Sequence, residues 1–114
     1  MRPHERLEVW KVSIDFVSEI YRLTKAFPKD EIYGLSAQMR RAAVSVPSNI
    51  AEGCARKGKK EQDQFLYIAR GSLSEIETQL HIASRLEYLS KEHHCNLLST
   101  SSRISAMIQG LIAK

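Results

Sequence analysis

The sequence predicts an all-α protein, an antiparallel up-down-up-down four-helix bundle that assembles into a homo-oligomer. Three observations lead to the bundle: four segments with apolar residues every three or four positions, short links between them, and only five glycines and three prolines to build turns. A chain of 114 residues is the size of one domain, which we assign to residues 1–114. With 43% hydrophobic and 26% charged residues, it can bury a core.

The first predicted helix covers residues 5–26 and ends before Pro28. It carries two apolar stripes on nearly opposite sides. One stripe consists of Leu7, Trp10, Ile14, Val17 and Tyr21, and the other of Val9, Val12, Phe16, Ile20, Leu23 and Phe27. Because a helix in a monomeric bundle needs only one apolar face, the second stripe predicts self-association. We place the predicted subunit interface on Val9, Val12, Phe16, Ile20 and Leu23.

The second predicted helix covers residues 35–56 and contains Pro47. A proline inside a helix removes one backbone hydrogen bond, so the helix either kinks there or breaks and restarts. Its apolar stripe keeps the same phase on both sides of Pro47, which favours a kink. The stripe consists of Leu35, Met39, Ala43, Val46, Ile50 and Cys54.

Two further helices complete the predicted bundle. Residues 61–89 carry the stripe Leu66, Ala69, Leu73, Ile76, Leu80 and Ala83, and residues 91–112 carry Leu97, Ser101, Ile104, Ile108 and Leu111. Gly71 and Ser72 interrupt good helix-forming sequence in the third helix. We expect these small residues to mark a close approach of a neighbouring helix.

Positive charge is concentrated in the second quarter of the chain. The net charge is +4 and the sequence pI about 9.2, a mild indication of anionic partners. Between positions 36 and 60, Glu52 is the only acidic residue, whereas residues 61–89 carry five acidic and two basic residues. Either the basic segment faces a polyanion, or it is a solvated loop that neighbouring elements neutralise. The predicted nucleic-acid contacts are Arg40, Arg41, Arg56, Lys57, Lys59 and Lys60.

A polar face runs along the second predicted helix. Its members are Gln38, Arg41, Ser45, Asn49 and Glu52. Two interpretations stay open. In the structural one, Glu52 pairs with a basic side chain one turn away, while Asn49 and Ser45 compensate for the backbone bond lost at Pro47. In the functional one, the arginines of this region present charge to phosphates.

No enzymatic constellation emerges, and we predict no catalytic residue, no metal and no cofactor. His93, His94 and Cys95 are adjacent, so their side chains point about 100° apart on a helix, and His81 falls on another helix. The two cysteines, Cys54 and Cys95, are too few for a disulfide framework and are expected to be reduced thiols. No apolar run reaches the roughly 18 residues of a membrane span, and no signal-peptide core is evident, which predicts a cytoplasmic protein.

Several runs of residues resemble the signature of a known family. They are Arg40-Arg41-Ala42, Ser45, Asn49-Ile50-Ala51-Glu52-Gly53, Phe65-Leu66-Tyr67-Ile68-Ala69-Arg70-Gly71-Ser72 and Glu75. The family comprises bacterial four-helix bundle proteins first noted as open reading frames within intervening sequences of 23S rRNA genes. It includes relatives of the accessory variability protein of diversity-generating retroelements.

The resemblance implies a ring-like homopentamer that binds nucleic acid and, in the retroelement branch, a reverse transcriptase. It also implies a polar motif of Arg40, Arg41, Asn49, Glu52, Arg56 and Arg70, with close-packing sites at Gly53, Gly71 and Ser72. The expected function is therefore non-enzymatic binding of RNA or DNA through a basic surface pooled by several copies. The alternative is a protein-interaction scaffold whose polar motif is structural.

Overall fold

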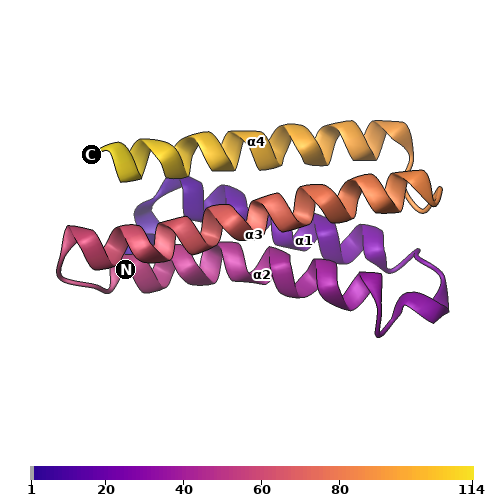
Figure 1. Ribbon diagram of the computed structural model, residues 1–114, viewed down its shortest axis with the longest axis horizontal. Coiled ribbons are helices and arrows are strands. Elements are labelled where there is room, and N and C mark those ends of the chain that lie inside the picture. Colours follow the sequence, from indigo (N-terminus) through magenta and orange to yellow (C-terminus); the bar gives the residue numbers. More distant parts are fainter. Residues whose placement is uncertain (1) are drawn as a thin grey trace.

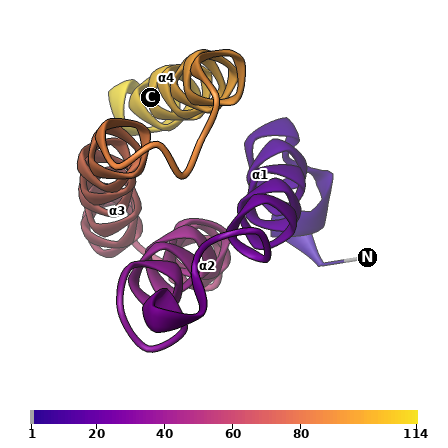
Figure 2. The ribbon, with the colours of Figure 1, turned by 90° about the vertical axis from the view of Figure 1, so that its right-hand side faces the viewer.

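The computed structural model describes residues 2–114 and is all-helical over them, with no strand in that range (Figure 1). Its elements are the 3₁₀-helix η1 (Pro3–Arg6), α1 (Glu8–Thr24), the 3₁₀-helix η2 (Lys29–Glu31), α2 (Leu35–Cys54), α3 (Lys59–Arg85) and α4 (Lys91–Ala113). The long helices alternate in direction and surround a common centre in chain order, as Figure 2 shows. The predicted all-α class and the four helices are thus confirmed. None of the helices described has both the length and the apolar character that a membrane crossing requires.

The core contains the predicted stripes of α2, α3 and α4. Apolar members such as Val46 of α2, Leu73 of α3 and Ile104 of α4 are almost fully buried. α2 continues through Pro47 without a break, in agreement with the unbroken phase of its stripe. The molecule measures 43 × 23 × 23 Å, as expected for long helices packed side by side around one core.

The placement of the subunit interface on α1 was wrong. Val9, Val12, Phe16, Ile20 and Leu23 are buried in the core of the single chain. The stripe that they form continues through Phe27, whose ring packs against Tyr88 in the turn after α3 at a centroid distance of 5.2 Å. This continuity lets it contact the bundle along the whole helix. The opposite stripe is the one that remains accessible, with Ile14 and Tyr21 each 39% exposed.

One end of the bundle is held by Glu31, which lies between α1 and α2. Its Oε1 accepts a hydrogen bond of 3.0 Å from the backbone N–H of Leu35 and so caps α2, while its Oε2 accepts one of 3.1 Å from the Tyr88 hydroxyl. The hydrogen bond to the Glu31 carboxylate raises the pKa of Tyr88 above its ordinary value. The α3–α4 turn is thereby tied to the α1–α2 connection. The opposite end carries the α2–α3 turn together with both chain termini (Figure 1).

Candidate nucleic-acid interface

The six predicted contacts do not form one patch. Arg40 and Arg41 lie in the second turn of α2, whereas Lys57 follows its last turn. Sixteen residues separate Arg41 from Lys57, a distance of about 24 Å along a helix axis. The sequence places these cations in one segment, but a helix of this length carries them to opposite ends. The six residues of one chain therefore do not make one continuous basic surface.

Arg40 has a structural role at the end of α1. Its Nε donates to Thr24 Oγ1 at 2.9 Å and its Nη2 to the Tyr21 carbonyl oxygen at 3.3 Å. The guanidinium carbon lies 4.6 Å from the centroid of the Tyr21 ring. A cation that bonds the last carbonyls of a helix stabilises its C-terminus. Arg40 therefore leaves the candidate interface, while Arg41 remains exposed on α2.

Lys59 has a comparable role at the other end of the molecule. Its Nζ lies 2.6 and 2.7 Å from the two carboxylate oxygens of Asp63, and it donates at 2.8 Å to the carbonyl oxygen of Ile112 near the end of α4. This ammonium joins the first turn of α3 to the last turn of α4. A phosphate would have to displace these oxygens, so Lys59 also leaves the candidate interface.

The α2–α3 turn retains two exposed lysines, Lys57 and Lys60. Among the side chains described in the structure, neither forms an ion pair. Arg56 pairs with Glu52 at 3.0 Å and lies over the ring of Phe65, 4.7 Å from its centroid, yet it stays exposed. The structural interpretation of Glu52 thus holds, and Arg56 borders the lysine pair.

An exposed aromatic ring extends this basic turn along α3. Tyr67 is 50% exposed, and the guanidinium carbon of Arg70 lies 5.1 Å from its ring centroid, while Arg70 also donates to Gln109 of α4. Because Lys60 and Tyr67 are seven residues apart, they share one face of the helix. We call Lys57, Lys60, Tyr67 and Arg70 the α3 basic face. Sequence analysis did not select Tyr67, although its spacing from Lys60 was a usable signal.

The polar residues in the middle of α2 form a network with α3. The Asn49 amide donates to the Ser45 carbonyl oxygen at 2.8 Å and to Ser45 Oγ at 2.9 Å, and this hydroxyl lies 2.9 Å from the Ser72 hydroxyl. This supports the structural interpretation for Ser45 and Asn49. It does not repair the gap at Pro47, since the carbonyl that loses its partner there belongs to Ala43. Gln38 at the start of the same face is exposed.

The expected close-packing sites separate into two kinds. A Cβ added to Gly53 would lie 3.1 Å from the backbone oxygen of Gln62 and 3.3 Å from Cβ of Phe65, so α3 approaches α2 closely there. Ser72 makes the polar contact just described. At Gly71 no atom lies within 4 Å of such a Cβ, because this residue faces outward. The prediction of a close approach is confirmed at Gly53 and wrong at Gly71.

The family model of the 23S rRNA-intervening sequence protein matches residues 5–110. The chain belongs to this family. Among solved structures, it is similar to a protein of unknown function from the S23 ribosomal protein family of Bacteroides thetaiotaomicron, with a TM-score of 0.83 and 23% sequence identity. The match covers 93% of this chain and 99% of that one, and it shows a shared fold. Comparison with curated proteins gives no match.

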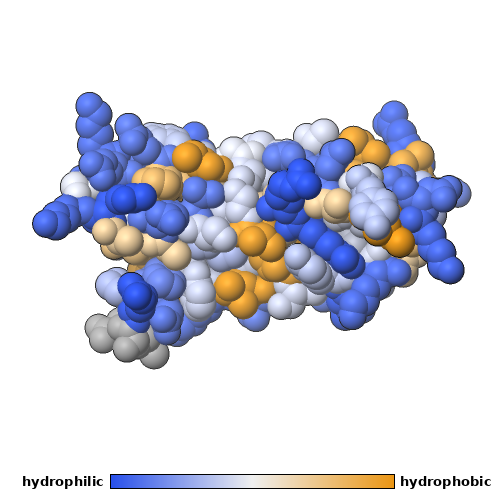
Figure 3. Space-filling model, turned by 90° about the horizontal axis from the view of Figure 1, so that it is seen from below, coloured by the Kyte–Doolittle hydropathy of each residue, from blue (hydrophilic) through white to orange (hydrophobic). Residues whose placement is uncertain are grey.

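The bundle leaves apolar surfaces exposed, two of which lie on different helices. We call the first the α1–α2 groove, which has a volume of about 370 Å³. Hydrophobic side chains are visible in the middle of the face that Figure 3 shows. Its lining comprises His4, Trp10, Ile14, Val17, Ser18, Val44, Pro47, Ser48 and Ala51. The second, which we call the α3 stripe, is formed by the half-exposed side chains of Ile68, Ile82 and Leu86.

The cysteines and histidines are the remaining candidates for chemistry. Cys54 and Cys95 are free thiols, and burial raises the pKa of Cys54 above its ordinary value. Among the described residues, no three histidine, cysteine or acidic side chains converge as a metal cluster. His94 nevertheless meets His81 across the α3–α4 interface, with 3.1 Å between ring nitrogens, a contact that the sequence analysis missed.

Proposed function

We propose that this protein is a non-enzymatic cytoplasmic protein that binds nucleic acid, preferentially single-stranded segments of RNA, as a homo-oligomer. The α3 basic face carries the proposal, because it combines two unpaired lysines with an exposed aromatic ring. Lysine ammonium groups neutralise phosphates, and the face of a tyrosine stacks on an unpaired base. The family's link to 23S rRNA genes supports RNA, whether ribosomal or from a retroelement, as the ligand.

Oligomerisation is the second part of the proposal. One chain offers only a small basic face, but several copies in a ring would present it repeatedly and bind through avidity. The α1–α2 groove and the α3 stripe are two different apolar surfaces, as a head-to-tail interface requires. We propose that the groove of one copy receives the α3 stripe of the next. The family resemblance suggests five copies.

The binding proposal is tested by fluorescence anisotropy with single-stranded RNA, structured RNA and duplex DNA at several salt concentrations. Lys57→Glu combined with Lys60→Glu should weaken binding at low salt and reduce the salt dependence, since each phosphate contact adds about 0.7 to 0.9 to its logarithmic slope. Lys25→Glu combined with Lys29→Glu is the matched control, because it changes the net charge equally at the other end of the bundle. Equal effects of the two pairs, or no binding by the natural chain, would refute the proposal.

The stacking component needs a separate variant. Tyr67→Ala should weaken binding to single-stranded RNA by about 1–3 kcal/mol and leave binding to duplex DNA nearly unchanged, because paired bases offer no free face. A uniform loss across the three ligands would show that the ring supports Arg70 rather than stacking on a base.

The interface is tested by disrupting its two sides separately. Ile14→Glu with Val44→Lys alters the groove, and Ile82→Glu with Leu86→Lys alters the stripe, all at exposed positions. Each variant should give smaller species by light scattering while circular dichroism shows unchanged helicity. A mixture of the two variants keeps one intact pair of surfaces and should form a heterodimer. Unchanged masses would refute this placement.

A protein-interaction scaffold is the alternative, and the internal hydrogen bonds of Ser45, Asn49 and Ser72 favour it by making that part of the motif structural. A reverse transcriptase is the partner that the retroelement branch suggests. Under this alternative, the charge reversals at Lys57 and Lys60 leave co-purification with that enzyme intact and no RNA is bound.

A further inference from the structure

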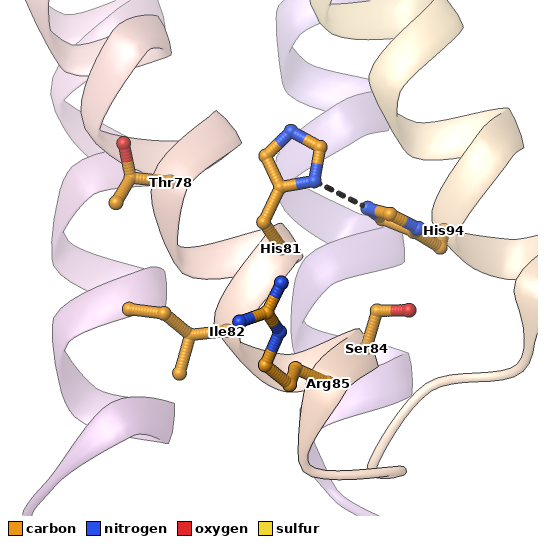
Figure 4. Close-up of a pocket in the computed structure, with 6 residues that line it drawn as sticks. All are labelled: Thr78, His81, Ile82, Ser84, Arg85 and His94. Atoms are coloured by element: carbon orange, nitrogen blue, oxygen red, sulfur yellow. Dashed lines mark hydrogen bonds between the residues drawn. The ribbon is translucent and has the colours of Figure 1, made fainter.

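Two imidazole rings face each other where α3 and α4 approach their connecting turn (Figure 4). Nδ1 of His81 lies 3.1 Å from Nε2 of His94, and the rings are nearly perpendicular, at 83°, with centroids 4.9 Å apart. The rings border a surface pocket of about 470 Å³, which Thr78, Ile82, Ser84 and Arg85 also line. His81 is exposed and His94 half-buried, so water reaches both.

This contact requires a particular arrangement of protons. For the two nitrogens to share a hydrogen bond, one carries the proton and the other presents a lone pair. If the proton of the donor ring moves to its other nitrogen, both facing nitrogens present lone pairs. That tautomer change keeps each imidazole neutral, so a cation could enter between the rings without net release of a proton.

The separation of the nitrogens suits a metal ion. Two imidazole nitrogens each about 2.05 Å from a common ion, and 3.1 Å from each other, subtend an angle of about 100° at that ion. This angle lies between those of octahedral and tetrahedral coordination. Modest ring rotation would point both lone pairs at the same position. No third protein ligand converges there among the described residues, so water would complete the coordination shell.

We propose that His81 and His94 bind a divalent transition-metal ion of the Zn²⁺, Ni²⁺ or Cu²⁺ type and so link α3 to α4. Neutral imidazole suits these borderline ions, whereas Mg²⁺ and Ca²⁺ prefer oxygen ligands. The ligands come from two helices that meet only in the folded chain. The ion therefore binds the native state preferentially and stabilises it by mass action.

Two charged residues of α3 lie one helical turn from His81. Arg85 lies one helical turn after His81 and lines the same pocket, so its positive charge opposes a cation. Glu77 lies one turn before His81, but its carboxylate already accepts a hydrogen bond of 3.1 Å from Ser101. The proposal therefore predicts that Arg85→Gln strengthens metal binding several-fold.

The experiment uses the full chain without an affinity tag, titrated with ZnCl₂, NiCl₂ and MgCl₂ by calorimetry and followed by thermal unfolding. Zn²⁺ and Ni²⁺ should bind at one ion per chain and raise the unfolding temperature, and Mg²⁺ should do neither. His81→Gln and His94→Gln should each weaken binding by at least about tenfold, the size of loss that even outer-shell metal-site changes cause. Circular dichroism verifies that both variants fold.

Two neighbouring variants make the test specific. His93→Gln changes the histidine beside His94, and Cys95→Ser removes the exposed thiol that follows it. Both variants should bind Zn²⁺ and Ni²⁺ as the natural chain does. Loss of binding in either of them would place the ion elsewhere and overturn the proposal. Absence of binding by the natural chain, or unchanged binding in His81→Gln and His94→Gln, would also overturn it.

Discussion

Replacing Gly53 by alanine tests how closely α2 and α3 approach each other. The added Cβ would lie 3.1 Å from the backbone oxygen of Gln62 and 3.3 Å from Cβ of Phe65, both closer than ordinary van der Waals contact. Neither atom is the end of a flexible side chain, so the helices must separate by a few tenths of an ångström. Overpacking of this kind costs about 1–3 kcal/mol. Alanine recovers only about 0.5–1 kcal/mol through its higher helix propensity.

The expected net effect of Gly53→Ala is a loss of about 1 kcal/mol in the free energy of unfolding. Gly71→Ala is the matched control, because the same methyl group enters open space on the outside of α3. It should gain about 0.5–1 kcal/mol from helix propensity alone. The two variants should therefore shift the unfolding temperature in opposite directions, by about 4 °C for each kcal/mol in a domain of this size.

Urea denaturation followed by far-ultraviolet circular dichroism measures both free energies, at one protein concentration so that assembly contributes equally. If Gly53→Ala stabilises the protein as much as Gly71→Ala does, the approach at Gly53 is not close and the packing of α2 on α3 is misjudged.

Three further outcomes are expected. Arg40→Gln should lower the free energy of unfolding by about 1–2 kcal/mol through the loss of its bonds at the end of α1, whereas Arg41→Gln should change it by less than about 0.5 kcal/mol in the same urea titration. Iodoacetamide should modify Cys95 before Cys54, as followed by mass spectrometry, because burial raises the pKa of Cys54 and depletes its reactive thiolate; equal rates would contradict this. Tyr88→Phe should lower the free energy of unfolding at neutral pH, because it removes the hydrogen bond to Glu31. Since the folded-state pKa of Tyr88 is raised, the difference should persist up to the unfolded-state pKa of about 10 and disappear as the pH rises through the folded-state value. A difference independent of pH would refute the hydrogen bond to the ionised carboxylate.

Periodicity predicted the fold well because burial imposes it directly. In α3, the positions from Leu66 to Ala83 that recur every three or four residues are the ones that the bundle buries. On α1 the same signal was ambiguous, since both stripes are apolar and only the position of neighbouring helices decides between them. Phe16 proved to be core, and Ile14 proved to be surface.

The candidate site was less predictable because charged residues that are close in sequence can lie far apart in the folded chain. Arg41 and Lys60 belong to one basic segment, but Arg41 lies in the second turn of α2, whereas Lys60 lies in the first turn of α3. The free lysines could be distinguished from Lys59 only by seeing its contact with the end of α4. The pairing of His81 with His94 likewise depends on the turn that sets the alignment of α3 and α4, which periodicity alone does not define.

The hydroxyl and amide groups joining Asn49, Ser45 and Ser72 limit the alternatives open to this bundle during folding. The contact between α2 and α3 also includes the close approach at Gly53, and a slide of one helical turn, about 5.4 Å, would bring a residue with a larger side chain to that point. Such a slide would break the contact between the Ser45 and Ser72 hydroxyls, which joins α2 to α3, and a buried hydroxyl left without a partner costs about 1–3 kcal/mol. The misaligned form is therefore penalised at both places, while the native alignment loses little. Replacing Ser45 and Ser72 by aliphatic side chains would remove the polar part of this discrimination even if the resulting protein melted at a higher temperature.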